Sequence, residues 1–401
     1  METKISNAHE KRIFGLKKNV FFLGLVSLFN DFSNEMIQSV MPVFLGVVLG
    51  LPPIAIGVIE GVADAVASFL KVVSGWVSDK LRERKNLAII GYAVSVTSRL
   101  FLALASLFSH VFALRVIDRV GKGIRDAPRD ALLAESVSEH ELARSFGYHR
   151  AMDALGGTLG PLAAFVLLPA LYYNYQALFI VAFFVGLLSL LSFFFVQDKK
   201  PAEDAGAPKF DFGLLKKHKH FAFYLAAIFV FGLGTLPITL MLFYPVVIES
   251  AKGMSYLANI PLAYFAYSLT FVLTAIPLGK FADSVGKRVT IAVGFAMAII
   301  AYLGLAYSTS FGAVLFFFVV FGIYSGATDG VERALAARLI DRKLLATGEG
   351  MLNAAVGVSS LLSGLIGGAL WTFYGPAAAF VYGAILSSVG LCVFLIFAFK
   401  K

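Results

Sequence analysis

Long apolar runs separated by short polar turns fill most of the chain. Each run holds about 20 or more mostly apolar residues, the length that a helix needs to cross a bilayer. The runs lack the period-two alternation of barrel strands, so they predict helices. They cover residues 20–49, 54–78, 87–108, 111–133, 143–168, 172–196, 221–248, 256–282, 289–307, 311–339, 345–371 and 377–399. The pattern therefore predicts an all-α integral membrane protein with twelve transmembrane helices.

One long hydrophilic break, at 197–220, separates the sixth run from the seventh. It predicts an N-terminal six-helix bundle at 1–196, a cytoplasmic linker, and a C-terminal six-helix bundle at 221–401. The two halves also share a sequence pattern, because the segment 75–84 after the second run recurs as 279–288 after the eighth. Parallel repeats of this kind place a central cavity between two bundles that can rock around it.

Lysine and arginine lie almost entirely on one side of the predicted membrane. The six turns on the other side hold one basic residue, Lys252. Since basic residues accumulate in cytoplasmic loops, we expect both termini in the cytoplasm and a multi-pass protein of the plasma membrane. The net charge of +9 is then a signal of topology. It argues for the lipid bilayer, and against nucleic acid, as a partner, and we expect a monomer.

The composition agrees with this class. Of 401 residues, 59% are hydrophobic and 15% are charged, whereas a soluble domain carries roughly 25% charged residues. The single cysteine, Cys392, allows neither an intrachain disulfide nor a thiolate cluster. We therefore expect no metal site and no cofactor.

Charged residues inside the predicted spans gather in the first half. Each costs roughly 2.5–3.5 kcal/mol at a span centre, so each is a candidate functional residue. Asp31 and Glu35 lie four residues apart near the centre of the first span, and Asp64 lies near the centre of the second. A carboxyl group in an apolar, intermittently wet cavity holds a proton more readily than one in water. These three acids are the predicted proton-coupling residues.

Substrate contacts are expected from both halves. In the first half, most of the buried charges should pair with one another and a minority should change partner during transport. The spans of the second half are almost uncharged apart from Asp329, Glu332 and Arg333. They are rich in aromatic residues, which more often serve packing or lipid contact than ligand binding. The predicted substrate-binding residues are Asn34, Gln38, Arg115, Asp118, Arg119, Arg150, Met241, Tyr244, Tyr264 and Tyr267.

The duplicated segment resembles the loop motif of the major facilitator superfamily (MFS). The first copy matches that motif at Gly75, Asp79, Lys80 and Arg84, and departs from it at Arg82 and Glu83. The second copy keeps Gly279, Asp283, Gly286, Lys287 and Arg288, and loses a base at Ser284. The resemblance covers essentially the whole chain and implies the two-bundle MFS fold. It also implies a gating role for these residues, unless their charges only set the topology.

Two further segments carry the resemblance. Gly156, Gly160 and Pro161 in the fifth span are similar to a motif of the family's proton-coupled antiporters, which implies a gating role. Close helix packing is the other interpretation of these small residues. The stretch 118–132, together with 30–36, is similar to a bacterial and archaeal branch of the superfamily. That branch does not fix a substrate.

Three functions are open at this point. The first is proton-coupled export, by antiport, of a small amphiphilic or cationic compound, with the proton gradient as energy source. The second is transport of an anionic metabolite or metal chelate, held by arginine and lysine of the fourth and fifth spans. The third is a non-transporting receptor on the same fold. An enzyme is not expected, since the sequence holds no catalytic triad, metal-ligand cluster or cofactor fingerprint.

Overall fold

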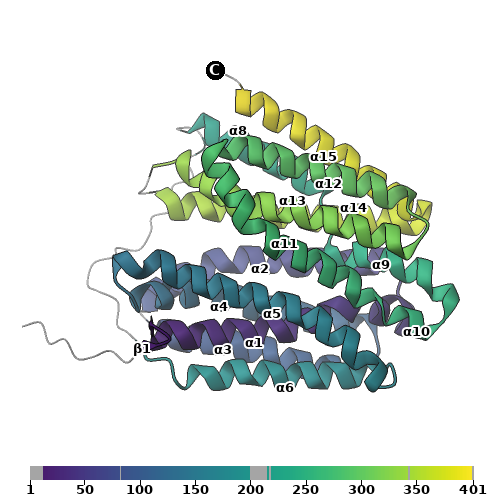
Figure 1. The fold of residues 1–401 in the computed structure, drawn as a ribbon, viewed down its shortest axis with the longest axis horizontal. Helices are drawn as coiled ribbons and strands as arrows, with labels where there is room; N and C mark the ends of the chain where they lie inside the picture. The colour runs from purple at the N-terminus through teal and green to yellow at the C-terminus, as the bar shows by residue number, and fades with distance from the viewer. Residues whose placement is uncertain (1–11, 82, 199–214, 216–217, 342–343, 400–401) are drawn as a thin grey trace, which may run out of the picture.

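The computed structural model describes residues 12–81, 83–198, 215, 218–341 and 344–399. Nearly all of them lie in helices that run side by side (Figure 1). A short antiparallel hairpin precedes the helices, formed by β1 (Arg12–Ile13) and β2 (Leu16–Lys17). The predicted linker at 197–220 lies largely outside the described residues, so its bounds stay a prediction.

The first six long helices, which we call the N bundle, pack against one another through α1–α5, α1–α6, α2–α4 and α3–α4 contacts. They are α1 (Lys18–Val43), α2 (Pro53–Leu81), α3 (Arg84–Leu102), α4 (Phe108–Glu135), α5 (Leu142–Ala170) and α6 (Tyr175–Phe193). A π-helical turn, Phe44–Val48, extends α1, and a 3-10 turn, Glu139–Glu141, precedes α5.

The remaining helices, which we call the C bundle, form the other half of the molecule (Figure 1). They are α8 (Lys219–Gly234), α9 (Ile238–Glu249), α10 (Met254–Leu257), α11 (Ile260–Ser284), α12 (Lys287–Tyr307), α13 (Phe311–Arg338), α14 (Leu345–Tyr374) and α15 (Pro376–Phe399), with a 3-10 turn at Ser250–Lys252. Their main contacts join α11 with α13, α12 with α13 and α15, and α8 with α14 and α15.

The seventh predicted run is broken into α8 and α9. Pro237 precedes α9 and cannot donate a backbone hydrogen bond, and it restricts the residue before it to extended conformations. Side chains from other helices satisfy backbone groups that the break frees. The Leu236 amide donates to the Tyr302 hydroxyl at 3.0 Å, and Ser363 donates to the Thr235 carbonyl at 2.9 Å. A break at membrane depth is stable when neighbouring helices supply such partners.

Nine helical segments among the described residues are long and apolar enough to cross a membrane, with α8 and α9 counted as one. Every predicted run falls on a helix, but α1, α3 and α4 are not among the nine. These three helices carry many of the buried polar side chains. The apolar segments support the membrane fold, while the count of twelve crossings and the side of the termini stay predictions.

The two bundles meet most closely along α2 and α14. Gly57 and Gly364 lie so close that a Cβ on either would collide with the backbone of the other, and Gly368 similarly packs on Ile54. The Ile54 amide also donates to the Thr372 hydroxyl at 2.9 Å. Small residues let helix backbones approach closely in a membrane. This contact lies toward the ends of α2 and α14 that the sequence predicts to face outward.

Candidate functional site

A buried ion pair joins α4 to α2 within the N bundle. Arg115 of α4 donates from Nε to Glu60 Oε1 at 3.1 Å and from Nη2 to Glu60 Oε2 at 2.8 Å. Both side chains are almost fully buried. Such a pair is stable in a low dielectric only when its geometry is good and its remaining polar atoms are satisfied. Here the guanidinium also donates to Gln38 Oε1 at 2.6 Å.

Gln38 carries this network across to the C bundle. Its carboxamide oxygen accepts from Arg115, and its nitrogen donates to the hydroxyl of Thr239 on α9. All three side chains are buried. A polar chain that begins at Glu60 therefore crosses the contact between α1 and α9.

The other buried arginines also have acidic partners. Arg119 lies 3.5 Å from Asp64 and 4.0 Å from Glu60. Arg99 lies 3.7 Å from Asp118 and donates to Asn30 Oδ1 at 2.9 Å. The predicted substrate contacts Arg115, Asp118 and Arg119 thus all belong to ion pairs within the N bundle, as expected for most of its buried charges.

Glu35 makes a contact of a different kind. The hydroxyl of Tyr264 on α11 donates to Glu35 Oε2 at 2.5 Å, and Asn34 donates to Oε1 at 2.9 Å. Asp31 accepts from Asn30 at 2.9 Å. Within the described part of the chain, no basic side chain lies at ion-pair distance from Asp31 or Glu35. Tyr264 stacks on Tyr267, with ring centroids 5.7 Å apart.

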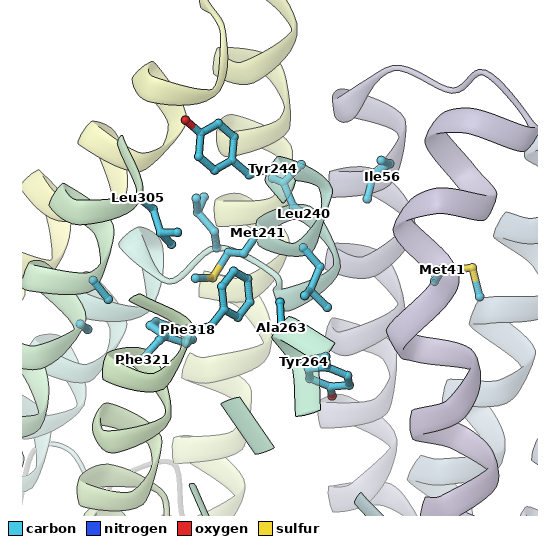
Figure 2. Close-up of a cluster of buried hydrophobic side chains, with 14 of the residues drawn as sticks. Met41, Ile56, Leu240, Met241, Tyr244, Ala263, Tyr264, Leu305, Phe318 and Phe321 are labelled. Carbon is cyan, nitrogen blue, oxygen red and sulfur yellow. The ribbon is translucent and has the colours of Figure 1, made fainter. Parts of the chain in front are cut away.

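Three predicted contacts lie away from this region. Met241 and Tyr244 are buried in the apolar core of the C bundle, where Tyr244 donates to the Ser308 carbonyl (Figure 2). Figure 2 shows Met241 beside Phe318 in this cluster. Arg150 is 60% exposed and lies 3.6 Å from Asp153. Asp153, which has no role predicted from sequence, also accepts a hydrogen bond from Ser27 of α1.

A cavity of about 340 Å³ opens mainly within the C bundle. Its walls come from α8, α11, α13 and α14, from the break between α8 and α9, and from α2 of the N bundle. Two predicted site residues, Asp64 and Tyr267, line it. Glu332 also lines it and was not assigned to the site from sequence, although a carboxylate in an apolar span is a signal that would have found it.

The predicted gating residues for which the structure gives contacts touch their own bundle. Arg84 pairs with Glu135 at 2.7 Å, Lys287 with Asp283 at 2.9 Å, and Arg288 donates to the Ala398 carbonyl at 2.9 Å. The nearest contact of a Cβ built on Gly75 would be Ala127, and one built on Gly279 would meet nothing within 4 Å. The side chains of Asp79 and Lys80 lie outside the described residues, so the gating role stays a prediction.

The glycines of the fifth span serve packing in this state. A Cβ on Gly160 would lie 2.7 Å from the Met36 amide and the Phe32 carbonyl, and Gly156 packs equally closely on Leu28 and Phe32. Pro161 is buried beside them. These residues bring α5 against α1. Their predicted gating role in an antiporter stays a prediction, because close packing does not test it.

Among the described residues, no group of three or more His, Cys, Asp or Glu side chains could hold a metal ion. The buried charges pair across three helices of one bundle, α2, α3 and α4, and polar contacts from α1 reach α9 and α11 of the other. The sequence model of the Major Facilitator Superfamily matches residues 23–265 and 239–401. The chain belongs to this superfamily.

Relatives within the superfamily agree with this assignment. The chain is 30% identical to an uncharacterized MFS-type transporter of Methanocaldococcus jannaschii, over 93% of each protein. It is 28% identical to the quinolone resistance protein NorA of Staphylococcus aureus, over 52% of this chain and 50% of NorA. It is 30% identical to multidrug resistance protein D of Escherichia coli, over 30% of this chain and 31% of that protein.

Solved structures show the same fold. The nucleoside transporter NupG superposes with a TM-score of 0.77 at 14% identity, over 94% of this chain and 98% of NupG. A peptide transporter, POT, in complex with sulfate superposes with a TM-score of 0.78 at 14% identity, over 97% of this chain and 95% of POT. The MFS protein described here is a multi-pass transporter of the plasma membrane rather than an enzyme.

Proposed function

We propose that this MFS protein is a proton-coupled transporter that exports a small amphiphilic or cationic compound by alternating access. The observation that carries the proposal is the hydrogen bond from Tyr264 of the C bundle to Glu35 of the N bundle. Glu35 and Asp31 lack basic partners in the described part of the chain. Each can therefore take up or release a proton without breaking an ion pair.

A proton on Glu35 would change how the bundles hold together. A carboxylate accepts a hydrogen bond roughly twice as strongly as a neutral group does. Protonation therefore weakens the bond from Tyr264 and favours a state in which the bundles have separated at this point. Release of the proton favours the contact again. Such a differential interaction with two states is what a coupling ion needs in order to shift their populations.

Relatives and the cavity support the direction and the substrate class. Two of the relatives are named for resistance to drugs, and both match only part of the chain. The C bundle supplies aromatic side chains around a cavity, as a binding site for an amphiphilic compound would require. We propose that the protein works as a monomer, without a cofactor, and uses the proton gradient.

Transport of an anionic metabolite or metal chelate is the alternative. Its ligands would be Arg115, Arg119, Lys122 and Arg150, and the three arginines already pair with acids of the N bundle. An anion would have to displace a buried carboxylate, which leaves that charge without a partner. A non-transporting receptor would not need the acid Glu35 at the bundle interface.

The test is gradient-driven accumulation of the lipophilic cation ethidium in proteoliposomes with an acidic interior. Wild type should accumulate ethidium and release protons as it does so. The double variant Asp31→Asn, Glu35→Gln should lose this accumulation, while Glu349→Gln, which removes an exposed carboxylate of α14, should keep it. Undiminished accumulation by the double variant would contradict the proposal. A wild type that moves an organic anion and no cation would favour the alternative.

A further inference from the structure

The cavity of the C bundle has an aromatic wall. Phe231, Phe321 and Tyr324 line it, with ring centroids 5.6 Å apart for Phe231 and Tyr324 and 5.0 Å apart for Phe321 and Tyr324. Tyr267 continues the wall at 5.8 Å from Phe321. The faces of such rings attract cations, most strongly where water is excluded. The volume of the cavity, about 340 Å³, falls within the range of sites for small organic molecules.

Two carboxyl groups line the cavity. Among the described residues that line it, Glu332 and Asp64 are acidic and none is basic. Arg119 lies 3.5 Å from Asp64 and offsets that charge. Glu332 differs, because within the described part of the chain no hydrogen bond or ion pair reaches its carboxylate, and only its backbone carbonyl accepts, from Tyr224. A buried carboxyl group without a bonded partner is costly to ionise, and a bound cation would offset that cost.

The break between α8 and α9 also borders the cavity. Gly232, Thr235 and Pro237 line the cavity, so the carboxyl-terminal end of α8 lies at its wall. The last carbonyls of a helix carry partial negative charge, and interrupted helices in transporters use such ends to hold cations. These carbonyls already accept hydrogen bonds, Leu233 from Tyr382 at 2.8 Å and Thr235 from Ser363 at 2.9 Å, so a ligand would meet the helix end through its dipole alone. The aromatic side chains and the carboxyl group of Glu332 therefore carry the preference for a positively charged ligand.

We infer that this cavity is a binding site for a lipophilic organic cation, with Glu332 as its anionic anchor and Phe231, Phe321 and Tyr324 as its aromatic wall. The role of this site in a transport cycle rests on the proposed function. The inference adds the class of substrate and the residues that bind it. Asp64 lies at the side of the cavity that faces the N bundle, where it also contacts Ser360 of α14 at 3.5 Å. A cation in the cavity would compete with Arg119 for Asp64.

Equilibrium binding tests the inference without any gradient, so that its failure is separate from a failure of proton coupling. Tetraphenylphosphonium is titrated into the purified, full-length protein by calorimetry, beside tetraphenylborate, an anion of the same shape. Wild type should bind the cation and not the anion. Glu332→Gln should weaken binding of the cation at least tenfold, and Tyr324→Ala should weaken it several-fold.

A matched control is Asp329→Asn, which removes a carboxylate one turn away on α13 that does not line the cavity. It should change the affinity by less than about twofold. Glu332→Asp keeps the charge and should retain more affinity than Glu332→Gln, provided that both melt at the wild-type temperature without ligand. Equal losses of affinity in Glu332→Gln and Asp329→Asn would contradict the role of Glu332 as the anionic anchor. Binding of tetraphenylborate as tight as that of the cation, or no binding of the cation to wild type, would overturn the site.

Discussion

Gln38 of α1 donates a hydrogen bond to the hydroxyl of Thr239 on α9, although 201 positions separate the two residues. The same carboxamide accepts from Arg115, which pairs with Glu60. One amide side chain thus joins the buried ion pair of the N bundle to the C bundle. When the bundles separate at this point, Gln38 must find another partner for its nitrogen or expose it to water.

Removing the hydroxyl of Thr239 should therefore loosen the bundle interface. Thr239→Val keeps the shape and leaves a buried amide donor unpaired, which costs about 1–3 kcal/mol. We expect a lower melting temperature, which is measured by the intrinsic fluorescence of the purified protein. Thr328→Val is the control, because the Thr328 hydroxyl bonds only within α13, at 2.9 Å to the Tyr324 carbonyl. Equal shifts in the two variants would argue against a special role of the Gln38 contact.

The ion pair between Arg115 and Glu60 should be far more costly to break than to replace. Arg115→Met leaves Glu60 buried without its partner. We expect the free energy of unfolding to fall by about 3–5 kcal/mol, as in other proteins with such a change. The double variant Arg115→Met, Glu60→Leu removes both charges and should recover most of the stability. The measurement is the fraction of folded protein after heating, by size-exclusion chromatography. A double variant no more stable than Arg115→Met would show that the pair does not account for the loss.

The contact of α2 with α14 should hold one state of the transporter. Gly364→Ala places a methyl group against the Gly57 carbonyl, so the helices have to separate there. Spin labels are attached at positions Leu51 and Tyr374 after Cys392→Ser removes the native thiol. We expect a longer distance between the labels by double electron–electron resonance. Gly312→Ala is the control, because its Cβ would meet nothing within 4 Å. An unchanged distance in Gly364→Ala would contradict a role of this contact in the state.

Tyr264→Phe tests the role of the hydrogen bond separately from the role of the Glu35 carboxyl group. It removes the donor to Glu35 and leaves the carboxyl group in place, so proton uptake should continue while its effect on the bundles weakens. We expect gradient-driven accumulation of ethidium in proteoliposomes to fall several-fold without vanishing. Tyr244→Phe also loses a hydroxyl, in its case one that bonds to the Ser308 carbonyl inside the C bundle, and should transport normally. Full transport by Tyr264→Phe would remove this hydrogen bond from the coupling mechanism.

The sequence alone determined the membrane class and most helices, because the length and apolarity of a run are local properties. It also singled out Asp31, Glu35 and Asp64, since a charge in an apolar run is visible without any partner. The repeat of 75–84 at 279–288 indicated the superfamily, because a repeated motif is a property of the residue order itself.

Only the tertiary structure decided which charges neutralise one another and which do not. Glu60 and Arg115 are 55 positions apart, and Glu35 and Tyr264 are 229 apart, so no helical period predicts that they meet. The fold put Met241 and Tyr244 in the core, and Glu332 at a cavity. The physical reason is that a helix fixes the face on which a side chain lies, while the packing of helices distant in sequence fixes what that face meets.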